Sequence, residues 1–374
     1  MSESPATILF AGGGTGGHLY PGIAVAEALR ARAPHLTPVF LCTQRAIDST
    51  ILSPTGFEFI AQPIVPPAIS VGGLLRFFKS WRETKEQVRA ILRERKPAAV
   101  LGLGGYAAGV AVKTGALKNL PTAILNSDVI PGKANQYLMR FATHVCCGFE
   151  QTREHVSSNH AAKLIVTGCP IRSSMLQLPP RDQAATRLGL DPRLSTLLIT
   201  GASQGAVSVN EAMLAKAGAL KLQGWQLLHL SGKDHAEKVR QEYREQSIPA
   251  VVVDFTPAMS DVWAVSDLAI ARSGASTIAE LCACGVPSIL MPYPFHKDLH
   301  QRANARVLAD AGAAILLDDE KDAKLNAARL KPALESLLYD APRRKQMSAA
   351  ARQLGRPDAA DAVAQVIVNL LASR

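Results

Sequence analysis

A glycine-rich turn between a short apolar run and a helical pattern constrains the fold of this 374-residue chain more than any other feature. Five of the six residues at positions 12–17 are glycine, after the run Ile8-Leu9-Phe10 and before a helix whose first turn we expect at Pro21. Proline suits that position because its missing N–H needs no partner there. The absent side chains let an anion approach the unpaired amides at the start of the helix. The turn therefore predicts a strand–turn–helix unit with an anion site, edged by the titratable side chain of His18.

The turn differs from two common phosphate-binding motifs. No Gly-Lys-Ser/Thr sequence ends it, so a P-loop is excluded. A dinucleotide fingerprint needs a third glycine at a fixed spacing and an acidic residue at the end of the next strand, which we expect over Pro38–Cys42, and both are missing. A tight turn that only packs a helix on a sheet is the structural alternative. The rest of the chain must decide between them.

Short apolar runs alternate with helical patterns along the chain, which predicts parallel sheets covered by helices. The pattern restarts near Gly168-Cys169-Pro170, and a second glycine-rich turn, Gly201–Ala206, then follows a strand. We expect an α/β fold of two Rossmann-like domains facing a cleft, with ligands beyond the carboxyl ends of the strands. The expected strands are Ile8–Ala11, Pro38–Cys42, Phe57–Gln62, Ala98–Leu101, Thr122–Leu125, His144–Cys147, Lys163–Val166, Thr196–Thr200, Gln226–Leu230, Ala250–Asp254, Leu268–Ala271, Pro287–Met291 and Ala313–Leu316.

Composition narrows the classes of partner. The net charge of +10 favours an anionic partner, and basic residues spread without a nucleic-acid-binding pattern argue against nucleic acid. The six cysteines form no C-x-x-C pair and lie mostly in apolar runs, which is typical of buried thiols in a reducing compartment. No signal peptide precedes the first strand, and no apolar stretch is long enough to span a bilayer. We expect a cytoplasmic protein that is still able to touch a membrane.

Two further stretches follow expected strands. Gly102–Gly109 is another glycine turn aimed at the cleft, and Arg272–Glu280 begins with small polar residues that can start a helix and hold a phosphate through backbone amides. Glu280 lies within that helix, where its carboxylate can accept two hydrogen bonds from a sugar diol. The alternative for Glu280 is an ordinary solvated helix residue.

The segment Pro292–Ala305 is unusually polar for a connection. His296 and His300 are four residues apart, which would suit a metal ion if the segment were helical, but no acidic partner pattern supports them and we expect no metal. Gln301 and Asn304 suit a neutral polar ligand such as a sugar.

The basic and aromatic segment Leu74–Lys85 leaves two interpretations open. Apolar residues recur at helical spacing between arginines and lysines, either as a core helix with a solvated face or as an anchor in a membrane surface. The apolar residues are Leu74, Phe77, Phe78 and Trp81.

Taken in order, the motifs of the chain resemble those of the MurG family, the UDP-N-acetylglucosamine:lipid I N-acetylglucosaminyltransferases of peptidoglycan synthesis. The resemblance runs over most of the chain, and the ordered set is specific although each motif alone is weak. The motifs are Gly13-Gly14-Thr15-Gly16-Gly17-His18, Gly102-Leu103-Gly104-Gly105-Tyr106, Pro131-Gly132-Lys133-Ala134-Asn135, Gly168-x-Pro170-Ile171-Arg172, Gly201-x-Ser203-Gln204-Gly205-Ala206, Arg272-Ser273-Gly274-Ala275 through Glu280, and His300-Gln301 with Asn304-Ala305.

The resemblance implies a GT-B fold and an inverting transfer of GlcNAc from UDP-GlcNAc to the 4-hydroxyl of the MurNAc of undecaprenyl-linked lipid I. The implied domains are an acceptor and membrane domain at 1–168 and a UDP-sugar domain at 169–355, with the helix 356–374 returning to the first. Neither a metal nor another cofactor is implied. The implied location is the cytoplasmic face of the cell membrane, on its anionic surface, with the patch Leu74, Phe77, Phe78 and Trp81 as the contact.

Residue roles follow by position. The implied substrate-binding residues are Thr15, Gly16, Gly17, Asp128, Arg172, Ser203, Thr256, Ala275, Ser276, Thr277, Ile278, Ala279, Glu280 and Gln301. Glu280 would bind the ribose hydroxyls and Gln301 the GlcNAc hydroxyls. The acceptor diphosphate would meet Gly13, Gly14, Gly104, Gly105 and Tyr106.

The chain departs from the family pattern beside the expected base. Leu125-Asn126-Ser127-Asp128 stands where the family usually has His-Glu-Gln-Asn, and Cys169 stands in the family's Gly-Asn-Pro. We expect His18 to take the acceptor proton, with Asp128 as its rival. Alternatives are a GT-B transferase with another acceptor, a UDP-GlcNAc epimerase of the same architecture, and a non-catalytic UDP-sugar-binding scaffold of the cell-wall machinery.

Overall fold

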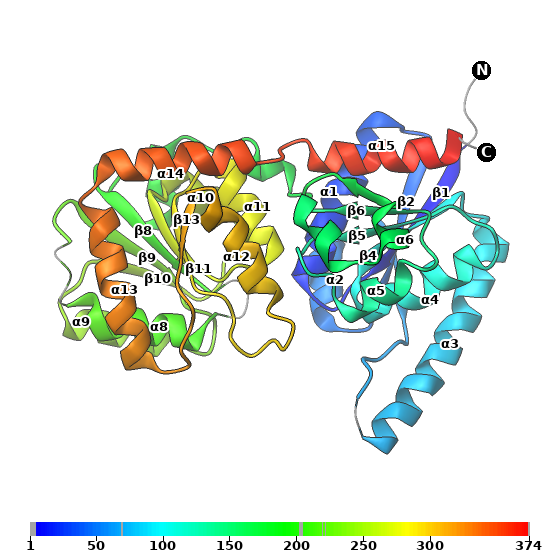
Figure 1. Cartoon of the computed structure of the whole chain (residues 1–374), viewed down its shortest axis with the longest axis horizontal. Helices are drawn as coiled ribbons and strands as arrows, with labels where there is room; N and C mark the ends of the chain where they lie inside the picture. Colours follow the sequence, from blue (N-terminus) through cyan, green and yellow to red (C-terminus); the bar gives the residue numbers. More distant parts are fainter. Residues whose placement is uncertain (1–4, 69, 202–204, 219, 221, 373–374) are drawn as a thin grey trace. The chain divides into compact units, whose positions relative to one another are not determined.

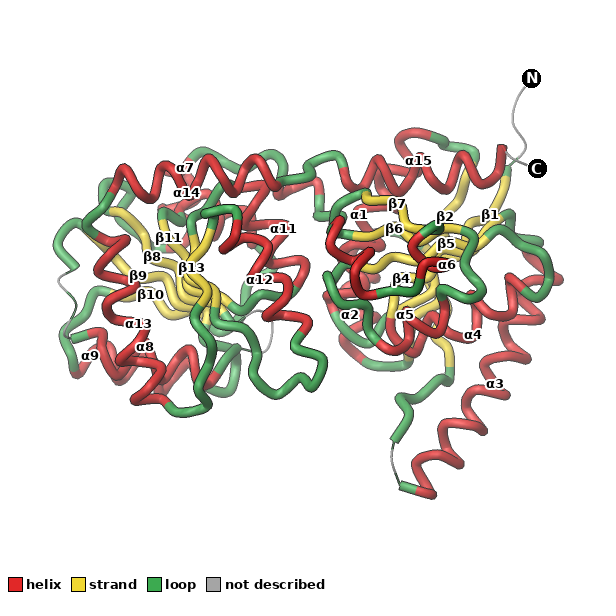
Figure 2. Tube along the Cα trace, viewed as in Figure 1, coloured by secondary structure: helices red, strands yellow, loops and turns green. Residues whose placement is uncertain are grey.

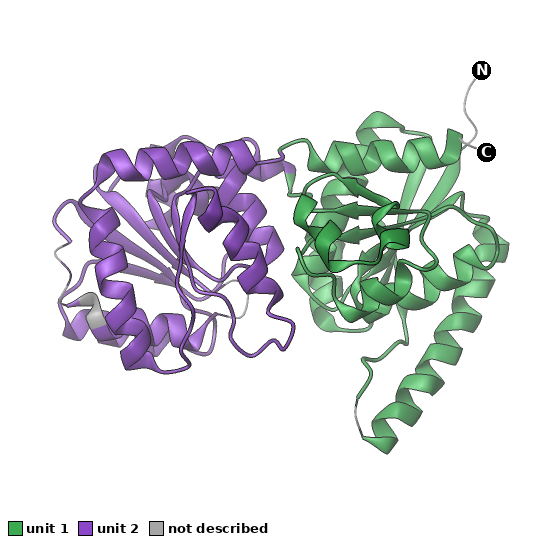
Figure 3. Cartoon of the chain, in the orientation of Figure 1, with its two compact units in different colours: residues 1–172, 357–374 green, residues 173–356 purple. Residues whose placement is uncertain are grey.

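The computed structural model describes residues 5–68, 70–201, 205–218, 220 and 222–372, without the side chains of residues 216 and 217. The chain forms two compact units, unit 1 from residues 1–172 and 357–374 and unit 2 from residues 173–356 (Figure 3). In each unit the strands lie between helices (Figure 2). The unit boundaries stand beside the expected limits at 168/169 and 355/356.

Unit 1 is built on a parallel sheet of seven strands in the order β3-β2-β1-β4-β5-β6-β7, so the order reverses between β1 and β4. The strands are β1 Ala6–Gly12, β2 Leu36–Thr43, β3 Glu58–Gln62, β4 Ala99–Gly104, β5 Thr122–Asn126, β6 His144–Cys147 and β7 Leu164–Val166. The helices are α1 Gly16–Arg32, α2 Ala46–Leu52, α3 Val71–Arg95, α4 Gly105–Ala116, α5 Lys133–Leu138, α6 Ser158–Ala161 and α15 Ala359–Ala372, with 3-10 turns η1 Ser53–Thr55 and η2 Glu150–His155.

Both faces of this sheet are buried. Side chains of a strand alternate between its two faces, so neighbouring residues show what covers each face. Ile8 and Phe10 of β1 pack in one core with α1 and α15, while Leu9 and Ala11 pack in another with α3 and α4. The continuous apolar run at the start of the chain is therefore a central strand covered on both sides.

The last helix, α15, belongs to unit 1 and lies against α1 (Figure 1). Its apolar face, including Val363, Ile367 and Leu370, is buried in the same core as α1. Arg32 at the end of α1 donates a hydrogen bond to Gln365 Oε1 at 2.7 Å. The two ends of the chain thus contribute to one core.

Unit 2 repeats the architecture with six parallel strands in the order β10-β9-β8-β11-β12-β13, and its order reverses between β8 and β11. The strands are β8 Ser195–Thr200, β9 Trp225–Leu230, β10 Ala250–Val253, β11 Leu268–Ala271, β12 Ser288–Leu290 and β13 Ala314–Leu316. The helices are α7 Arg181–Leu188, α8 Val207–Ala217, α9 Ala236–Glu245, α10 Met259–Val265, α11 Ala275–Cys284, α12 His300–Asp310, α13 Ala323–Leu338 and α14 Ala341–Leu354, with the 3-10 turn η3 Ser173–Met175.

The α/β fold class predicted from the sequence is confirmed, and each expected strand has a counterpart in one of the two sheets. One helix boundary was wrong. Helix α1 begins at Gly16, so Pro21 lies inside it and not in its first turn. The ring of Pro21 meets the backbone four residues earlier at Gly17, which has no side chain to add to the crowding. Starting the helix earlier brings His18 into its first turn.

The six cysteines are all free and buried, as predicted from their place in apolar runs. Among the described residues, no helix combines the length and the apolar character needed to cross a bilayer.

Candidate functional site

The two glycine turns of unit 1 meet where its strand order reverses. Strands β1 and β4 are neighbours, and Gly12 pairs with Gly104 at their carboxyl ends. The turn after β1 carries His18, and the turn after β4 carries Gly104 and Gly105. Open α/β sheets bind ligands at such a point, since the two connections there leave in opposite directions and expose the strand ends.

Asp48 of α2, which the sequence analysis did not single out, organises the first turn. It is fully buried, and its carboxylate accepts hydrogen bonds from the Gly14 amide at 2.7 and 2.9 Å. It also accepts from the amide and the hydroxyl of Thr43, at 2.8 and 2.7 Å. A Cβ on Gly13 would lie 2.2 Å from the Asp48 carboxylate, so only glycine fits there.

The Gly14 amide, which we expected to face the acceptor diphosphate, is thus donated to a carboxylate of the chain itself. Arg45 closes the same turn from the other side, because its guanidinium donates to the Gly14 carbonyl at 2.6 Å. The Tyr106 hydroxyl lies close to this turn, 3.5 Å from where a Gly14 Cβ would stand. The turn is therefore preformed. The groups that it leaves for an anion are the backbone amides at the start of α1, at Gly16 and Gly17.

His18 is held between the two turns in a defined tautomer. Its Nδ1 lies 3.2 Å from the Gly13 carbonyl and 3.3 Å from the Thr15 hydroxyl. Since a carbonyl oxygen only accepts, Nδ1 carries the proton in the first contact, and Nε2 then has a free lone pair. The ring packs flush on Gly104 and Gly105, where an added Cβ would meet it at 3.1 and 2.9 Å. Both glycines have positive φ, +103° and +71°.

The environment keeps His18 neutral near pH 7. Burial lowers the pKa of His18, while the Gly13 hydrogen bond and the charges of Asp128 and Asp48 partly oppose that shift. A neutral imidazole whose Nε2 is unprotonated can accept a proton from a hydroxyl group.

Asp128 lies near His18, close enough for its charge to act on that imidazole. The surrounding segment is ordered by amides, because Asn126 donates to the Asp128 carbonyl at 2.7 Å and receives a bond from Asn135 at 3.1 Å. Arg172, at the end of unit 1, stacks its guanidinium over the Tyr20 ring at 4.4 Å.

In unit 2 the strand order also reverses, between the neighbouring strands β8 and β11. The chain leads from these two strands into α8 and α11. Ser203, expected to bind the nucleotide, lies outside the described residues. Helix α11 begins at Ala275 after Gly274, and its first amides together with the helix dipole are able to bind an anion. Ala275 and Ile278 are buried, whereas Ser276, Thr277 and Ala279 are half-buried.

Glu280 is oriented by a residue that sequence reasoning missed. The indole N–H of Trp263 in α10 donates to Glu280 Oε2 at 2.8 Å, and Trp263 itself is 2% exposed. Glu280 is half-buried. The alternative of a solvated helix glutamate is therefore wrong for this residue. No local pattern could have indicated the contact, since the partners are 17 residues apart on different helices.

A buried ion pair frames the unit 2 site. The Arg272 guanidinium donates to Asp319 at 2.8 Å, to the Ser208 hydroxyl at 2.7 Å and to the Met291 and Pro292 carbonyls at 2.8 and 3.0 Å. It thereby ties the end of β11 to the start of α8 and to the segment after β12. Both charged side chains are at least nine-tenths buried.

Gln301 and Asn304 differ in role. The Gln301 side chain accepts from the Tyr293 amide at 3.0 Å at the half-buried start of α12, while its backbone carbonyl accepts from Ser273. Asn304 is fully buried and donates to the Ser273 carbonyl at 3.0 Å, so it supports the fold and was wrongly expected to face a ligand. Thr256 lies beyond the end of β10 and accepts from the Ala258 amide at 3.1 Å.

The patch predicted on the basic helix divides between core and surface. Phe77 and Trp81 of α3 are half-buried and pack on the core beside α4, with Trp81 against Gly109. Leu74 and Phe78 are exposed by 41% and 64%. Val71 and Leu75, which the sequence analysis left out, are exposed by 77% and 66%. The core interpretation therefore holds for the face of α3 that carries Phe77 and Trp81, and the membrane interpretation stays a prediction for the exposed face.

Comparison with known proteins gives a consistent result. The family model for the glycosyltransferase family 28 N-terminal domain matches residues 8–147, and that for the family 28 C-terminal domain matches residues 196–363. A relative from Halothermothrix orenii, UDP-N-acetylglucosamine–N-acetylmuramyl-(pentapeptide) pyrophosphoryl-undecaprenol N-acetylglucosamine transferase, is 33% identical and covers 97% of this chain and 98% of its own.

Solved structures share the fold at two levels of similarity. The crystal structure of Acinetobacter baumannii MurG has a TM-score of 0.74 and 26% identity, covering 99% of this chain and 100% of its own. A UDP-N-acetylglucosamine 2-epimerase has a TM-score of 0.67 with 12% identity, covering 100% of this chain and 98% of its own, and shows the fold alone. The chain therefore belongs to the MurG family of N-acetylglucosaminyltransferases, within the GT-B glycosyltransferase superfamily.

Proposed function

We propose that this enzyme transfers GlcNAc from UDP-GlcNAc to the 4-hydroxyl of the MurNAc of lipid I and forms lipid II. The observation that carries the proposal is His18, a neutral imidazole held with Nε2 unprotonated in a glycine turn where the strand order of unit 1 reverses. Family membership supports the choice of substrates, since the relatives are named for this transfer.

The donor is assigned to unit 2. Helix α11 supplies backbone amides and a positive dipole end for the diphosphate, together with Ser276 and Thr277. Glu280, oriented by Trp263, accepts hydrogen bonds from the ribose hydroxyls. Gln301 binds GlcNAc hydroxyls. Ser203 and Thr256 complete the proposed donor set of unit 2, and the family resemblance adds Arg172, the last residue of unit 1 before unit 2 begins.

The acceptor is assigned to unit 1. The start of α1 at Thr15, Gly16 and Gly17, with the Gly104–Gly105 turn and Tyr106, receives its diphosphate. His18 Nε2 takes the proton from the MurNAc 4-hydroxyl as that oxygen bonds to C1 of GlcNAc. The bond from C1 to the UDP oxygen breaks on the opposite face, its electron pair leaves with UDP, and the anomeric centre inverts. The α11 amides stabilise the developing phosphate charge.

We also propose that the exposed face of α3 contacts the anionic cytoplasmic face of the membrane. Val71, Leu74, Leu75 and Phe78 form an apolar surface, which we call the α3 patch. The end of α3 that carries it extends away from the rest of unit 1 (Figure 1). Arg76, Lys79 and Arg82 on the same helix are exposed and suit anionic headgroups.

The first test measures transfer of labelled GlcNAc from UDP-GlcNAc to a soluble lipid I analogue, with UDP release followed without acceptor. We expect acceptor-dependent product. Conversion of UDP-GlcNAc to its C2 epimer without acceptor would favour an epimerase, and tight UDP-GlcNAc binding without turnover would favour a scaffold. Another accepted hydroxyl compound in place of the analogue would point to a different acceptor.

The second test separates the two candidate bases. We expect His18→Asn to lower kcat by about 10²–10⁴-fold, the range for losing a general base. Asp128→Asn keeps the size of the side chain and should lower kcat less than about tenfold, because we assign Asp128 only an electrostatic effect. An unchanged circular dichroism spectrum and thermal midpoint show that each variant is folded, and unchanged UDP-GlcNAc binding shows that the donor site is intact. Loss of turnover in Asp128→Asn but not in His18→Asn would assign the base to Asp128.

A further inference from the structure

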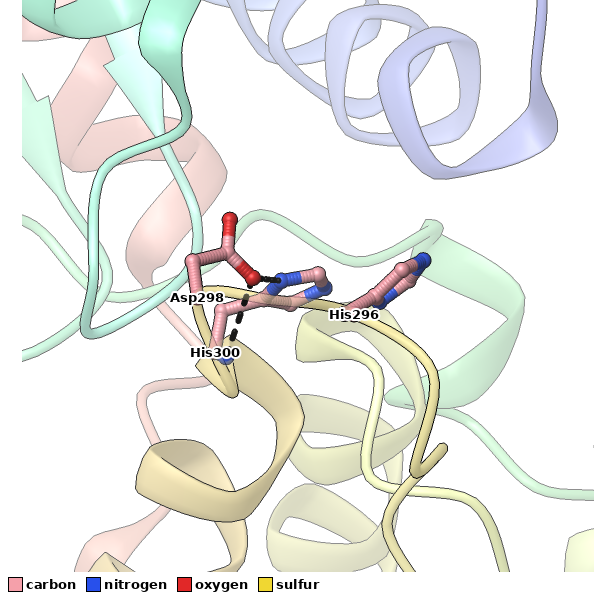
Figure 4. Close-up of side chains that lie close together, drawn as sticks. All are labelled: His296, Asp298 and His300. Carbon is pink, nitrogen blue, oxygen red and sulfur yellow. Dashed lines mark hydrogen bonds and ion pairs between the residues drawn. The ribbon is translucent and has the colours of Figure 1, made fainter.

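The segment between β12 and α12 brings together two imidazoles and a carboxylate outside the set of groups assigned above. The nitrogen and oxygen atoms of His296, Asp298 and His300 that could bind a metal lie within 4.8 Å of one another (Figure 4). From the sequence we expected no metal here, because no acidic partner pattern supported the two histidines, but Asp298 lies beside them in the structure. Helix α12 begins only at His300, and a turn of the preceding loop carries His296 back to it instead.

The three side chains are already ordered toward each other. Asp298 Oδ1 accepts from His300 Nδ1 at 2.7 Å, and it also receives the His300 amide at 3.4 Å. The imidazoles of His296 and His300 stack at 4.5 Å between centroids, with their planes 26° apart. The edge of the His296 ring meets Tyr293, with centroids 4.7 Å apart. These contacts reduce the conformational freedom that a ligand would otherwise have to remove.

The donor set selects a class of cation. Two imidazole nitrogens and one carboxylate oxygen suit zinc and its neighbours among the divalent transition metals, whereas Mg²⁺ and Ca²⁺ prefer oxygen ligands. Two ligands of one such ion lie about 3–4 Å apart, because each bond is about 2.1 Å long. A cation that replaces the proton between Asp298 and His300 therefore needs only small side-chain rotations. His296 and Asp298 are exposed, which leaves an open path and room for water ligands.

We propose that His296, Asp298 and His300 form a binding site for a divalent transition cation, with Zn²⁺ as the representative ion. The site lies in one nine-residue loop and helix start, between Pro292 and His300, so it needs no other part of the chain. It is independent of the transfer reaction, and its failure would leave the proposed function untouched.

The test uses the untagged, reduced full-length protein, so that no histidine tag competes for the metal. Zn²⁺ is titrated at pH 7.5 against a chromogenic chelator, and Co²⁺ binding is followed by its visible absorption, which reports the number and type of ligands. We expect one ion per chain with low-micromolar affinity. The variants His296→Asn and His300→Asn should each weaken Zn²⁺ binding at least tenfold, while an unchanged circular dichroism spectrum and thermal midpoint show that each variant is folded.

His155→Asn is the matched control, since His155 is an exposed histidine of unit 1 without this grouping, and it should bind Zn²⁺ as the wild type does. Binding in the wild type should also weaken steeply below about pH 6, because metal and proton compete for imidazole. Equal binding by the wild type and the His296→Asn/His300→Asn double variant would overturn the proposal. So would a Co²⁺ spectrum that indicates only water ligands.

Discussion

The strand order reverses in both units, but the two units bury charged side chains of opposite sign beside that point. In unit 1 the buried carboxylate of Asp48 accepts the amide of the glycine turn where the strand order reverses. The group that this turn offers to a ligand is the imidazole of His18. In unit 2 the buried cation of Arg272 pairs with Asp319. The group that unit 2 offers to a ligand is the start of α11. The same reversal of strand order thus frames two different sites, for which we propose a proton acceptor in unit 1 and a diphosphate and ribose site in unit 2.

The comparison also shows why neither turn could be interpreted from its glycines alone. A glycine turn offers amides to any anion, and in unit 1 the chain supplies that anion itself. Three substitutions and one pH profile test this difference between the units.

The stability of unit 2 should be sensitive to the loss of one charge from its buried ion pair. Asp319→Ala leaves the Arg272 guanidinium buried without its counter-ion, which should lower the free energy of unfolding of unit 2 by about 3–5 kcal/mol. Asp318→Ala is the neighbouring control, because its ion pair with Arg302 is nearly half-exposed and should contribute at most about 1 kcal/mol. Urea unfolding followed by hydrogen exchange in unit 2 measures both, and equal losses would contradict the assigned role of Asp319.

The frame of unit 1 should affect chemistry more than substrate binding. Asp48→Asn keeps the shape but replaces one accepting oxygen with a donor, which opposes the Gly14 or Thr43 donor that it faces. We expect kcat to fall about 10–100-fold while KM for UDP-GlcNAc changes less than about twofold, since the donor is assigned to unit 2. The ¹⁵N chemical shifts of His18 should show loss of the single Nδ1–H tautomer. A reduced kcat with an unchanged His18 tautomer would show that Asp48 does not act by fixing that tautomer.

The orientation of Glu280 should affect substrate binding more than chemistry. Trp263→Phe fills most of the same buried space but removes the indole N–H that Glu280 accepts. We expect KM for UDP-GlcNAc to rise about 3–10-fold with little change in kcat, because the lost hydrogen bond only orients Glu280 and a typical hydrogen bond contributes about 0.5–1.5 kcal/mol. Trp225→Phe is the control, because Trp225 is also buried in unit 2 but lies on β9. Equal effects of both variants would assign Trp263 a packing role only.

The pH dependence should distinguish the two units by a small but directional shift. Because burial lowers the pKa of His18, the acid limb of kcat/KM should have its midpoint below about pH 6.5. The charge of Asp48 raises the pKa of His18, so Asp48→Asn should move that midpoint to still lower pH. The unit 2 variant Asp261→Asn should leave it in place. A midpoint that shifts upward in Asp48→Asn would contradict the electrostatic assignment.

A fifth prediction concerns the α3 patch and the open alternatives for that helix. Leu75→Ser/Phe78→Ser should reduce co-sedimentation with vesicles containing anionic lipid several-fold, and salt should weaken the binding of the wild type. Leu117→Ser removes an equally exposed leucine elsewhere in unit 1 and should have no effect. We avoid Trp81 in this test, since its ring packs on Gly109 and its loss would disturb the core. Binding that survives the double substitution would rule out the patch.

The amino-acid sequence by itself determined the two sheets, their strands and the position of the glycine turns. Strands are encoded locally, because a central parallel strand must be apolar on both faces and a short apolar run between turn residues has few other uses. Ordered motifs also determined the family. His18, Glu280 and Gln301 could be proposed from the sequence because they follow strands whose position the apolar pattern fixes.

Only the tertiary structure decided which groups meet those turns. Asp48 lies in a short helix with no distinctive local pattern, and Trp263 looks like any core aromatic, yet each contacts a proposed site residue across 17 or more positions. Asn304 and Trp81 were assigned to ligands or membrane because a polar or amphipathic pattern does not reveal which neighbour a side chain packs against. Local sequence sets backbone preferences over a few residues, whereas burial and hydrogen-bond partners depend on chain segments that come together only in the folded protein.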